Sequence, residues 1–290
     1  MRTSFASSTR GLNHQLYPMR LWTKAKRLGT WDPSGIDLTQ DKADWQTLNE
    51  QEQDVLLRLT AQFQGGEESV TLDLLPLLHI MGEEGRIEEE LFLTAYLWEE
   101  AKHVEGFDRV LREVMQADGS QEAYFGAAYR QIFFQMLPEA MHRLRSDASV
   151  TAQAEALVTY QMIVEGVLAE TGYHGYYTAL AERDIMPGLR TMIQHIQRDE
   201  SRHIGYGLYV LARLIAEHGD VVWNTVEARM QALMPVCLQQ ITETLSPYGD
   251  DIPFNIDLNG FLGFGMGQFQ KRYERLVKAR SQSLEDVLYG

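Results

Sequence analysis

Two short motifs in this chain combine residue types that bind metal ions. In the stretches EEAKH and DESRH a glutamate precedes a histidine by three residues, giving the pairs Glu100–His103 and Glu200–His203. Residues three apart share one face of a helix, so each pair can present a carboxylate and an imidazole together. Each motif could therefore supply two ligands to a metal ion.

A pair with this spacing also arises easily by chance, so spacing alone decides little. A third pair, Glu139–His142, follows Pro138 and precedes arginines at 143 and 145. These neighbours are typical of a solvated helix face. We therefore keep only the first two pairs as candidate ligands.

Both remaining motifs have a partner glutamate upstream at matching distance. The turn expected at 82–85 lies midway between Glu67 and Glu100, and the break AERDIMPG begins midway between Glu165 and Glu200. In an antiparallel helical hairpin, residues equidistant from the turn stand at the same height. Two hairpins of this kind would place four glutamates and two histidines at one level, which is the donor set of a carboxylate-bridged di-metal site.

The surroundings of these residues favour burial and an outer layer of hydrogen bonds. Glu165 lies in the apolar stretch YQMIVEGVLAE, where an unpaired carboxylate would be costly. Asp199 precedes Glu200 and could accept the outer N–H of a ligand histidine, or it could be an ordinary solvated acid. Oxygen ligands with one imidazole for each metal suit iron or manganese better than metals that prefer thiolates.

The elements that must position these residues are helices. Few prolines interrupt long segments of helix-forming residues, and hairpin-like strand signals are missing. Thr47 and Glu50 resemble a capping box that opens a helix, and Gly65–Gly66 should interrupt it. The sequence predicts an all-α bundle with helices at about 47–64, 67–81, 86–115, 121–145, 149–182, 188–217, 221–245 and 258–280. We expect one domain over 1–290, with an irregular N-terminal segment (1–44) and a short C-terminal tail (281–290).

Composition excludes several other classes of protein. The chain has 26 basic and 41 acidic residues and a net charge of −15, which argues against binding to bare nucleic acid. Hydrophobic residues make up 44% of the chain, enough for a folded core. The longest apolar run, 74–81, is too short to span a membrane. Cys237 is the only cysteine, as expected for a protein of the reducing cytoplasm.

The ordered set of Glu67, EEAKH, Glu165 and DESRH resembles the ribonucleotide reductase small-subunit superfamily, which is ferritin-like, over about residues 45–280. Two departures matter. Reductase subunits usually carry a radical tyrosine where this chain has Phe107, although a manganese/iron subset has phenylalanine there too. They also commonly have aspartate where this chain has Glu67. About ten residues follow the last long helix, fewer than the tail by which reductase subunits dock their large partner.

The stretches GGEESVTLDLLPLL (65–78) and TYQMIVEG (159–166) resemble the R-two-like (R2-like) ligand-binding oxidases of that superfamily. The resemblance implies a mixed manganese/iron site that activates dioxygen, a long-chain fatty-acid-like ligand in an apolar tunnel, and a homodimer. It assigns manganese to Glu67 and His103, iron to Glu165, Glu200 and His203, and a bridging role to Glu100. A di-iron pair is the alternative metal content.

The same resemblance implies an ether crosslink between Val70 and Tyr160 beside the metals. Val70 is one helical turn from Glu67 and shares its face. Tyr160, however, is five residues before Glu165, about 140° around an ideal α-helix. Periodicity therefore does not bring Tyr160 to the site, and an irregularity in the helix would be needed.

The sequence thus predicts a dioxygen-using two-electron oxidase that forms an internal Val–Tyr crosslink. Two alternatives remain at this stage. One is a ribonucleoside-diphosphate reductase small subunit, which would need a large-subunit partner. The other is a ferritin-type metal-binding or storage protein, which normally needs a hollow multi-subunit shell.

Overall fold

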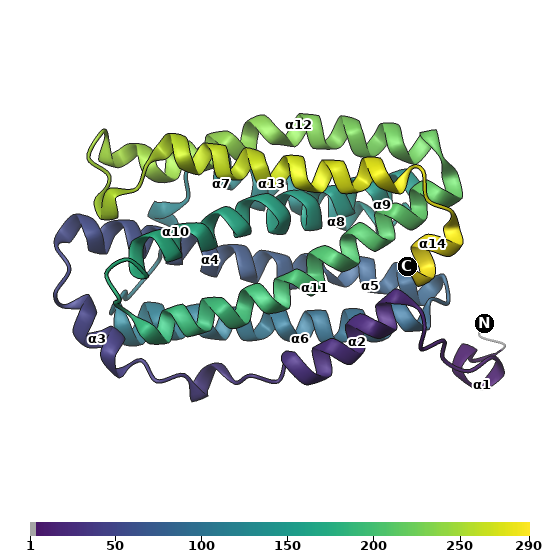
Figure 1. Cartoon of the computed structure of the whole chain (residues 1–290), viewed down its shortest axis with the longest axis horizontal. Helices are drawn as coiled ribbons and strands as arrows, with labels where there is room; N and C mark the ends of the chain where they lie inside the picture. Colours follow the sequence, from purple (N-terminus) through teal and green to yellow (C-terminus); the bar gives the residue numbers. More distant parts are fainter. Residues whose placement is uncertain (1–3) are drawn as a thin grey trace.

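The computed structural model describes residues 4–290, which form an elongated bundle of long helices (Figure 1). The described part of the chain contains no β-strand, so the predicted all-α class is confirmed. The α-helices are α1 (Ala6–Thr9), α2 (Tyr17–Leu28), α3 (Thr39–Trp45), α4 (Glu50–Asp73), α5 (Leu75–Glu83), α6 (Ile87–Arg109), α7 (Ala127–Gln131), α8 (Leu137–Arg143), α9 (Val150–Leu157), α10 (Glu170–Leu180), α11 (Pro187–His218), α12 (Asp220–Leu245), α13 (Leu258–Ala279) and α14 (Leu284–Tyr289). Short π-helical segments extend α6 (Val110–Val114) and join α7 to α8 (Ile132–Met136), and a longer one joins α9 to α10 (Val158–Ala169).

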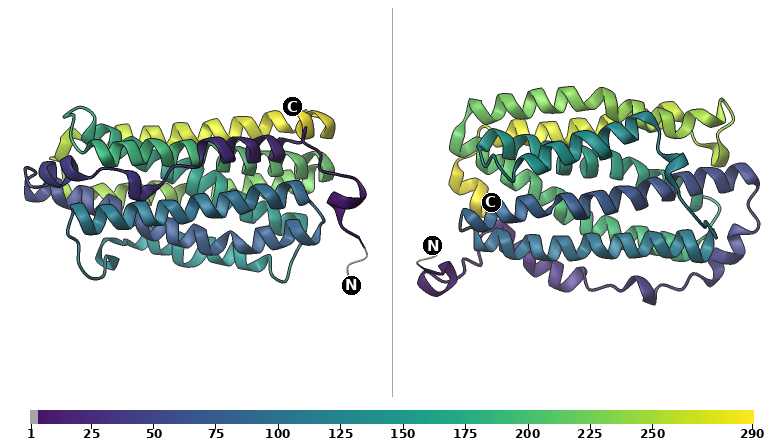
Figure 2. Two further views of the ribbon diagram at one scale, coloured as in Figure 1. Left: turned by 90° about the horizontal axis from the view of Figure 1, so that it is seen from below. Right: turned by 180° about the vertical axis from the view of Figure 1, so that it is seen from behind.

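Two helical hairpins lie at the centre of the bundle. In the first, α4 packs lengthwise against α6, and in the second, the continuous α9–π–α10 helix packs against α11. Helix α11 also contacts α6, so the hairpins meet along their inner faces. Helices α12 and α13 cover the second hairpin on one side, while α2 lies along α6 and α11 on another (Figures 1 and 2).

The start of α4 differs from the sequence-based prediction. The residue that caps the helix is Asn49, whose side chain accepts hydrogen bonds from the backbone N–H groups of Gln51 and Glu52. Glu52 in turn accepts from the Asn49 backbone N–H, which completes a capping box. The predicted pair of Thr47 and Glu50 was therefore wrong by two residues. Both pairs fit the motif, so its spacing alone does not distinguish them.

Gly65–Gly66 does not interrupt α4, contrary to the prediction. A Cβ atom on Gly65 would lie 2.7 Å from the Tyr129 hydroxyl and 2.8 Å from the Phe125 ring. The glycine is needed because aromatic rings approach the helix backbone closely, and α4 accepts its lower helix propensity. The helix instead ends at Asp73, and Pro76 lies in the first turn of α5.

The prediction that residues 1–44 are irregular is also largely wrong, because they include α2 and the start of α3. Residues 1–3 lie outside the described part. Helix α2 buries Met19, Leu21 and Ala25 against the bundle. The breakers Gly29, Pro33 and Gly35 all fall after this helix, so they end it rather than prevent it. The predicted tail 281–290 contains α14, which packs against α11.

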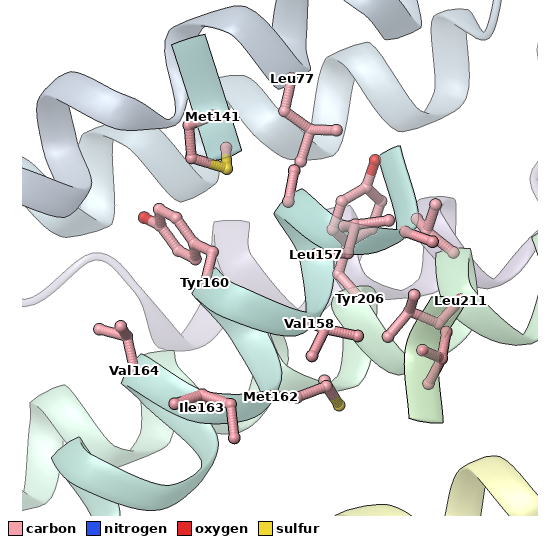
Figure 3. Close-up of a cluster of buried hydrophobic side chains, with 14 of the residues drawn as sticks. Leu77, Met141, Leu157, Val158, Tyr160, Met162, Ile163, Val164, Tyr206 and Leu211 are labelled. Carbon is pink, nitrogen blue, oxygen red and sulfur yellow. The ribbon is translucent and has the colours of Figure 1, made fainter. Parts of the chain in front are cut away.

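The long π-helical segment Val158–Ala169 changes which residues share a face. Hydrogen bonds in a π-helix join residues five apart rather than four. Tyr160 and Glu165 therefore lie toward the same face of the helix, whereas an α-helix would turn them well apart. The apolar side chains of this segment, Val158, Met162, Ile163 and Val164, pack into the core beside Tyr160 (Figure 3).

Close contact between α11 and this π-helix depends on Gly207. A Cβ atom there would lie 2.3 Å from Cβ of Gln161 and 3.3 Å from the Met162 methyl group. We expect Gly207→Ala to lower the free energy of unfolding by about 1–3 kcal/mol, because the helices must separate. Gly263→Ala on α13 is the control, since nothing lies within 4 Å of its Cβ position. Urea unfolding measures the stability of both variants. A Gly207→Ala variant as stable as the wild type would contradict the proposed crowding.

No helix in residues 4–290 combines the length and the apolar character needed to cross a membrane.

Candidate di-metal site

The structure brings all six predicted ligands together inside the bundle. They form two groups that share members, and in each group one donor atom per residue lies within 4.8 Å of the others. All six side chains are buried. The first group contains Glu67, Glu100, His103 and Glu200, and the second contains Glu100, Glu165, Glu200 and His203.

In the first group, Nδ1 of His103 faces three carboxylates. It lies 3.4 Å from Oε2 of Glu67, 3.5 Å from Oε2 of Glu100 and 3.4 Å from Oε1 of Glu200. Helix α4 supplies Glu67, α6 supplies Glu100 and His103, and α11 supplies Glu200. This group therefore joins residues from both hairpins.

In the second group, Nδ1 of His203 has the same kind of surroundings. It lies 3.0 Å from Oε1 of Glu100, 4.0 Å from Oε1 of Glu165 and 3.5 Å from Oε1 of Glu200. Glu100 thus offers one oxygen to each histidine. Glu200 offers the same oxygen to both, which places it between the groups rather than in the second alone.

The inner atoms of the cluster have no hydrogen-bond partner among residues 4–290. They are both carboxylate oxygens of Glu100, Nδ1 of His103 and of His203, and Oε2 of Glu165 and of Glu200. Buried polar atoms are normally paired, because leaving them unpaired costs free energy. Six buried donors, all oxygen or imidazole nitrogen, fit a pair of cations such as iron or manganese.

The electrostatics of the cluster support the same fit. Burial raises the pKa of Glu67 to about 8. Burial and the neighbouring Glu200 raise the pKa of Glu165 well above its usual value. Burial alone would raise the pKa of Glu100, but attraction to the two adjacent histidines outweighs it and lowers the pKa to about 2. Four ionised carboxylates at this site require bound cations, and loading the site would release protons from Glu67 and Glu165.

Two acids outside the cluster hold the ligand histidines. Oδ2 of Asp199 lies 3.4 Å from Nε2 of His103, in the role predicted from the sequence. Glu99, which the sequence analysis did not single out, lies 2.9 Å from Nε2 of His203 through Oε2. Each acid precedes a ligand in its own motif but holds the histidine of the other hairpin. The parallel between Glu99–Glu100 and Asp199–Glu200 was the signal that could have revealed Glu99.

Cations and a tryptophan fix these two acids in turn. Arg202 contacts Oε1 of Glu99 at 2.5 Å and also donates to Asp199. Lys102 and the Trp31 indole N–H donate to Oδ2 of Asp199 at 3.0 and 2.8 Å. Although burial opposes its ionisation, His103 and these cations lower the pKa of Asp199. The acid therefore stays ionised and can accept the outer N–H of a ligand histidine.

Tyr96 is a second contact that sequence reasoning missed. Its hydroxyl donates to Oε1 of Glu165, and its ring stacks on the His203 ring with centroids 3.6 Å apart. Tyr96 precedes Glu100 by one helical turn, so it lies on the ligand face of α6. It orients one carboxylate and one imidazole at the same time.

Val70 and Tyr160, the predicted crosslink pair, lie in contact beside the cluster. The Tyr160 hydroxyl donates to the Val70 backbone carbonyl at 3.1 Å, and both residues are buried. The Tyr160 ring meets Tyr96 edge-on with centroids 6.0 Å apart. The π-helix is the irregularity that spacing alone could not supply, because it turns Tyr160 toward the side of Glu165.

An apolar cavity reaches the same cluster from the surface. Its space, including the open mouth, is about 940 Å³. Glu67, Val70, Glu165 and Glu200 form part of its wall. The remaining lining is mainly apolar and comes chiefly from α4, the π-helical segment, α10, α12 and α13, including Val55, Leu59, Phe63, Leu168, Ile241 and Phe261. A mainly apolar cavity with carboxylates in its wall suits an apolar ligand whose polar end meets the cluster.

Comparison with known proteins agrees with this site. The family model described as ribonucleotide reductase, small chain, matches residues 18–245. An R2-like ligand-binding oxidase with an aerobically reconstituted Mn/Fe cofactor is similar in structure, with a TM-score of 0.91 and 33% identity, covering 95% of this chain and 98% of the other. The R2-like ligand-binding oxidase from Sulfolobus acidocaldarius has a TM-score of 0.91 and 32% identity, covering 99% of both chains.

The chain therefore belongs to the ribonucleotide reductase small-chain family. Within that family, the relatives found at 32–33% identity over nearly the whole chain are R2-like ligand-binding oxidases. The predicted family is confirmed, and the chain is an oxidoreductase with the fold of this family.

Proposed function

We propose that this protein is a dioxygen-activating Mn/Fe two-electron oxidase that binds a long-chain fatty-acid-like ligand and joins Val70 to Tyr160 by an ether bond. The observation that supports it best is the buried six-ligand cluster with unpartnered inner atoms, next to a valine and a tyrosine already in contact. The Mn/Fe cofactor of a similar oxidase supports the choice of metals.

Each ligand has a defined part in this proposal. Glu67 and His103 hold manganese, and Glu165 and His203 hold iron. Glu100 and Glu200 lie between the two positions. When bound, the metals supply the binding and reduction of dioxygen. The surrounding protein keeps the ligands ionised and correctly turned.

The crosslink is an oxidation that removes two hydrogen atoms from the protein. One C–H bond of the Val70 side chain and the O–H bond of Tyr160 break, and a C–O bond forms. The two electrons and two protons released would go to dioxygen, and two further electrons from bound metal ions with two protons from solvent would complete its reduction to two water molecules. Tyr160 is positioned for this step by its hydrogen bond to Val70 and by burial that excludes water.

The apolar cavity carries the proposal for the ligand. A long acyl chain would lie against Leu59, Phe63, Ile241 and Phe261, while its carboxylate would meet the metals near Glu67. Protein purified from cells, denatured and extracted with organic solvent should release fatty acids in about one-to-one ratio, as mass spectrometry can measure. Recovery of no acyl chain would count against this part.

The proposal also covers domain organisation, oligomeric state and cellular compartment. We infer that the chain acts as one domain, forms a homodimer and works in the cytoplasm, where the buried thiol of Cys237 would stay reduced. Sedimentation equilibrium tests the dimer, and limited proteolysis tests the single domain.

Intact mass before and after aerobic metal loading is the decisive test of the crosslink. We expect the loss of two hydrogen atoms, and a joined peptide that contains Val70 and Tyr160. Tyr160→Phe should abolish the mass change because it removes the oxygen that forms the ether. Tyr176→Phe is the control, since that buried tyrosine contacts Thr60 and not Val70. An unchanged mass with both metals bound would refute the crosslink.

The reductase alternative receives less support from the site. Phe107 is buried and stacks on Phe63, so no hydroxyl stands at the position of the usual radical tyrosine. Restoration of nucleotide reduction by this chain with a reductase large subunit would favour that alternative.

A further inference from the structure

A row of aromatic rings leads away from the metal cluster. Tyr96 stacks on His203 with centroids 3.6 Å apart. Phe92 lies 6.0 Å from the Tyr96 ring and 5.2 Å from the Tyr206 ring. These separations are those of rings in contact, so nothing else fits between them.

The row continues to the surface of the bundle. Tyr206 lies 6.4 Å from Tyr209, and Tyr209 stacks on Tyr17 at 5.5 Å. Tyr206 is fully buried, Tyr209 is 6% exposed, and Tyr17 on α2 is only half-buried. The row thus joins the cluster to solvent through helices α6, α11 and α2.

Tyr206 also has a proton acceptor that the metal site does not use. Its hydroxyl donates to Oε2 of Glu89 at 3.2 Å. Glu89 is itself buried beside Arg213 at 3.5 Å and Arg86 at 3.7 Å. Burial raises the pKa of Glu89, which makes its carboxylate a better base. A phenol becomes strongly acidic when oxidised, so a base in hydrogen-bond reach allows Tyr206 to lose an electron and a proton together.

We propose that this row of aromatic rings carries oxidising equivalents from the di-metal site to the surface when neither the crosslink nor the ligand consumes them. Its members, in order from the metal cluster, are Tyr96, Phe92, Tyr206, Tyr209 and Tyr17. The inference rests on the proposed function, because only a strongly oxidising site can withdraw an electron from tyrosine.

Tyr206 gives one electron to the oxidised site across Phe92 and Tyr96, and its proton to Glu89. Tyr17 then gives one electron to Tyr206 across the Tyr209 ring, Glu89 returns the proton, and Tyr17 releases its own proton to water. A thiol reductant at the surface restores Tyr17 with one electron and one proton, and two oxidised thiols join as a disulfide. In total, each thiol loses one electron and one proton. The electron reaches the metal site along the row, and the proton is released to solvent at Tyr17.

A nitroso spin trap tests the row without relying on activity. Metal-loaded protein is exposed to dioxygen with the trap, and peptide mass spectrometry locates the adduct. We expect an adduct on Tyr17 that is lost to the level of unloaded protein in Tyr206→Phe. Tyr273→Phe is the matched control, because that half-buried tyrosine contacts Trp223 and Phe269 and not the row. With a thiol present, Tyr206→Phe should also give a larger crosslinked fraction than the wild type.

The outcomes separate this inference from the proposed function. A crosslink without any adduct on Tyr17, or an adduct that survives in Tyr206→Phe, overturns the row and leaves the oxidase standing. Absence of both crosslink and adduct in fully loaded protein overturns both. Glu89→Gln, which keeps the shape of the acceptor, should reduce the adduct as Tyr206→Phe does; an unchanged adduct would remove Glu89 from the path.

Discussion

Glu200→Ala should deprive the protein of both metal ions. Oε1 of Glu200 lies 3.4 Å from Nδ1 of His103 and 3.5 Å from Nδ1 of His203, so one carboxylate oxygen serves both positions. Its removal weakens both sites at once, because fewer donor atoms remain for each cation. Elemental analysis after loading and desalting should find less manganese and less iron.

Two variants make this result specific. Glu67→Ala should chiefly lower the content of the metal ion bound next to His103, because Glu67 belongs to the first group alone. Glu68→Ala is the control, since that neighbour on α4 is exposed. If Glu200→Ala loses only the metal next to His203, the shared position is wrong, and the assignment from family resemblance, which gave Glu200 to iron alone, is right.

Glu99→Gln should lower metal affinity by about 10- to 100-fold, the usual effect of changing a residue that holds a ligand histidine. Glu99 accepts from Nε2 of His203 at 2.9 Å and is itself held by Arg202. The amide keeps the size of the side chain but removes the charge that favours the metal-bound imidazole. Competition with a chelator measures the affinity of each metal.

The effect of Glu99→Gln should fall mainly on the metal next to His203, because Asp199 holds the other histidine. Glu105→Gln on the same helix is exposed and serves as the control. Equal metal affinities in Glu99→Gln and wild type would show that the contact between Glu99 and His203 does not tune the site.

The clustering of the six candidate ligands could be predicted from the sequence, because residues equally far from the turn of a helical hairpin stand at the same height. Glu67 and Glu100 stand opposite each other about the turn before α6, as do Glu165 and Glu200 about the break before α11. This holds for any straight antiparallel pair, and it needs no knowledge of packing. The buried surroundings of Glu165 were equally visible in its apolar neighbours.

Helix boundaries near the ends of the bundle were less predictable. The first 44 residues contain few long apolar repeats. Helix α2 nevertheless forms, because it buries Met19, Leu21 and Ala25 where it packs against α6 and α11. Gly65 looked like a breaker, whereas the close aromatic contacts that require it come from residues sixty positions away. Such tertiary contacts override local propensity.

The sequence by itself therefore determined the helical class, the set of six candidate ligands and the pairing of its two halves, because regular periodicity encodes all three. Only the tertiary structure decided that Glu99 and Asp199 hold each other's histidines, that Glu200 lies between both groups, and that Tyr160 reaches Val70. The first two depend on how the hairpins cross, and the last on a π-helix, in which backbone hydrogen bonds join residues five apart instead of four. None of these is a property of local spacing.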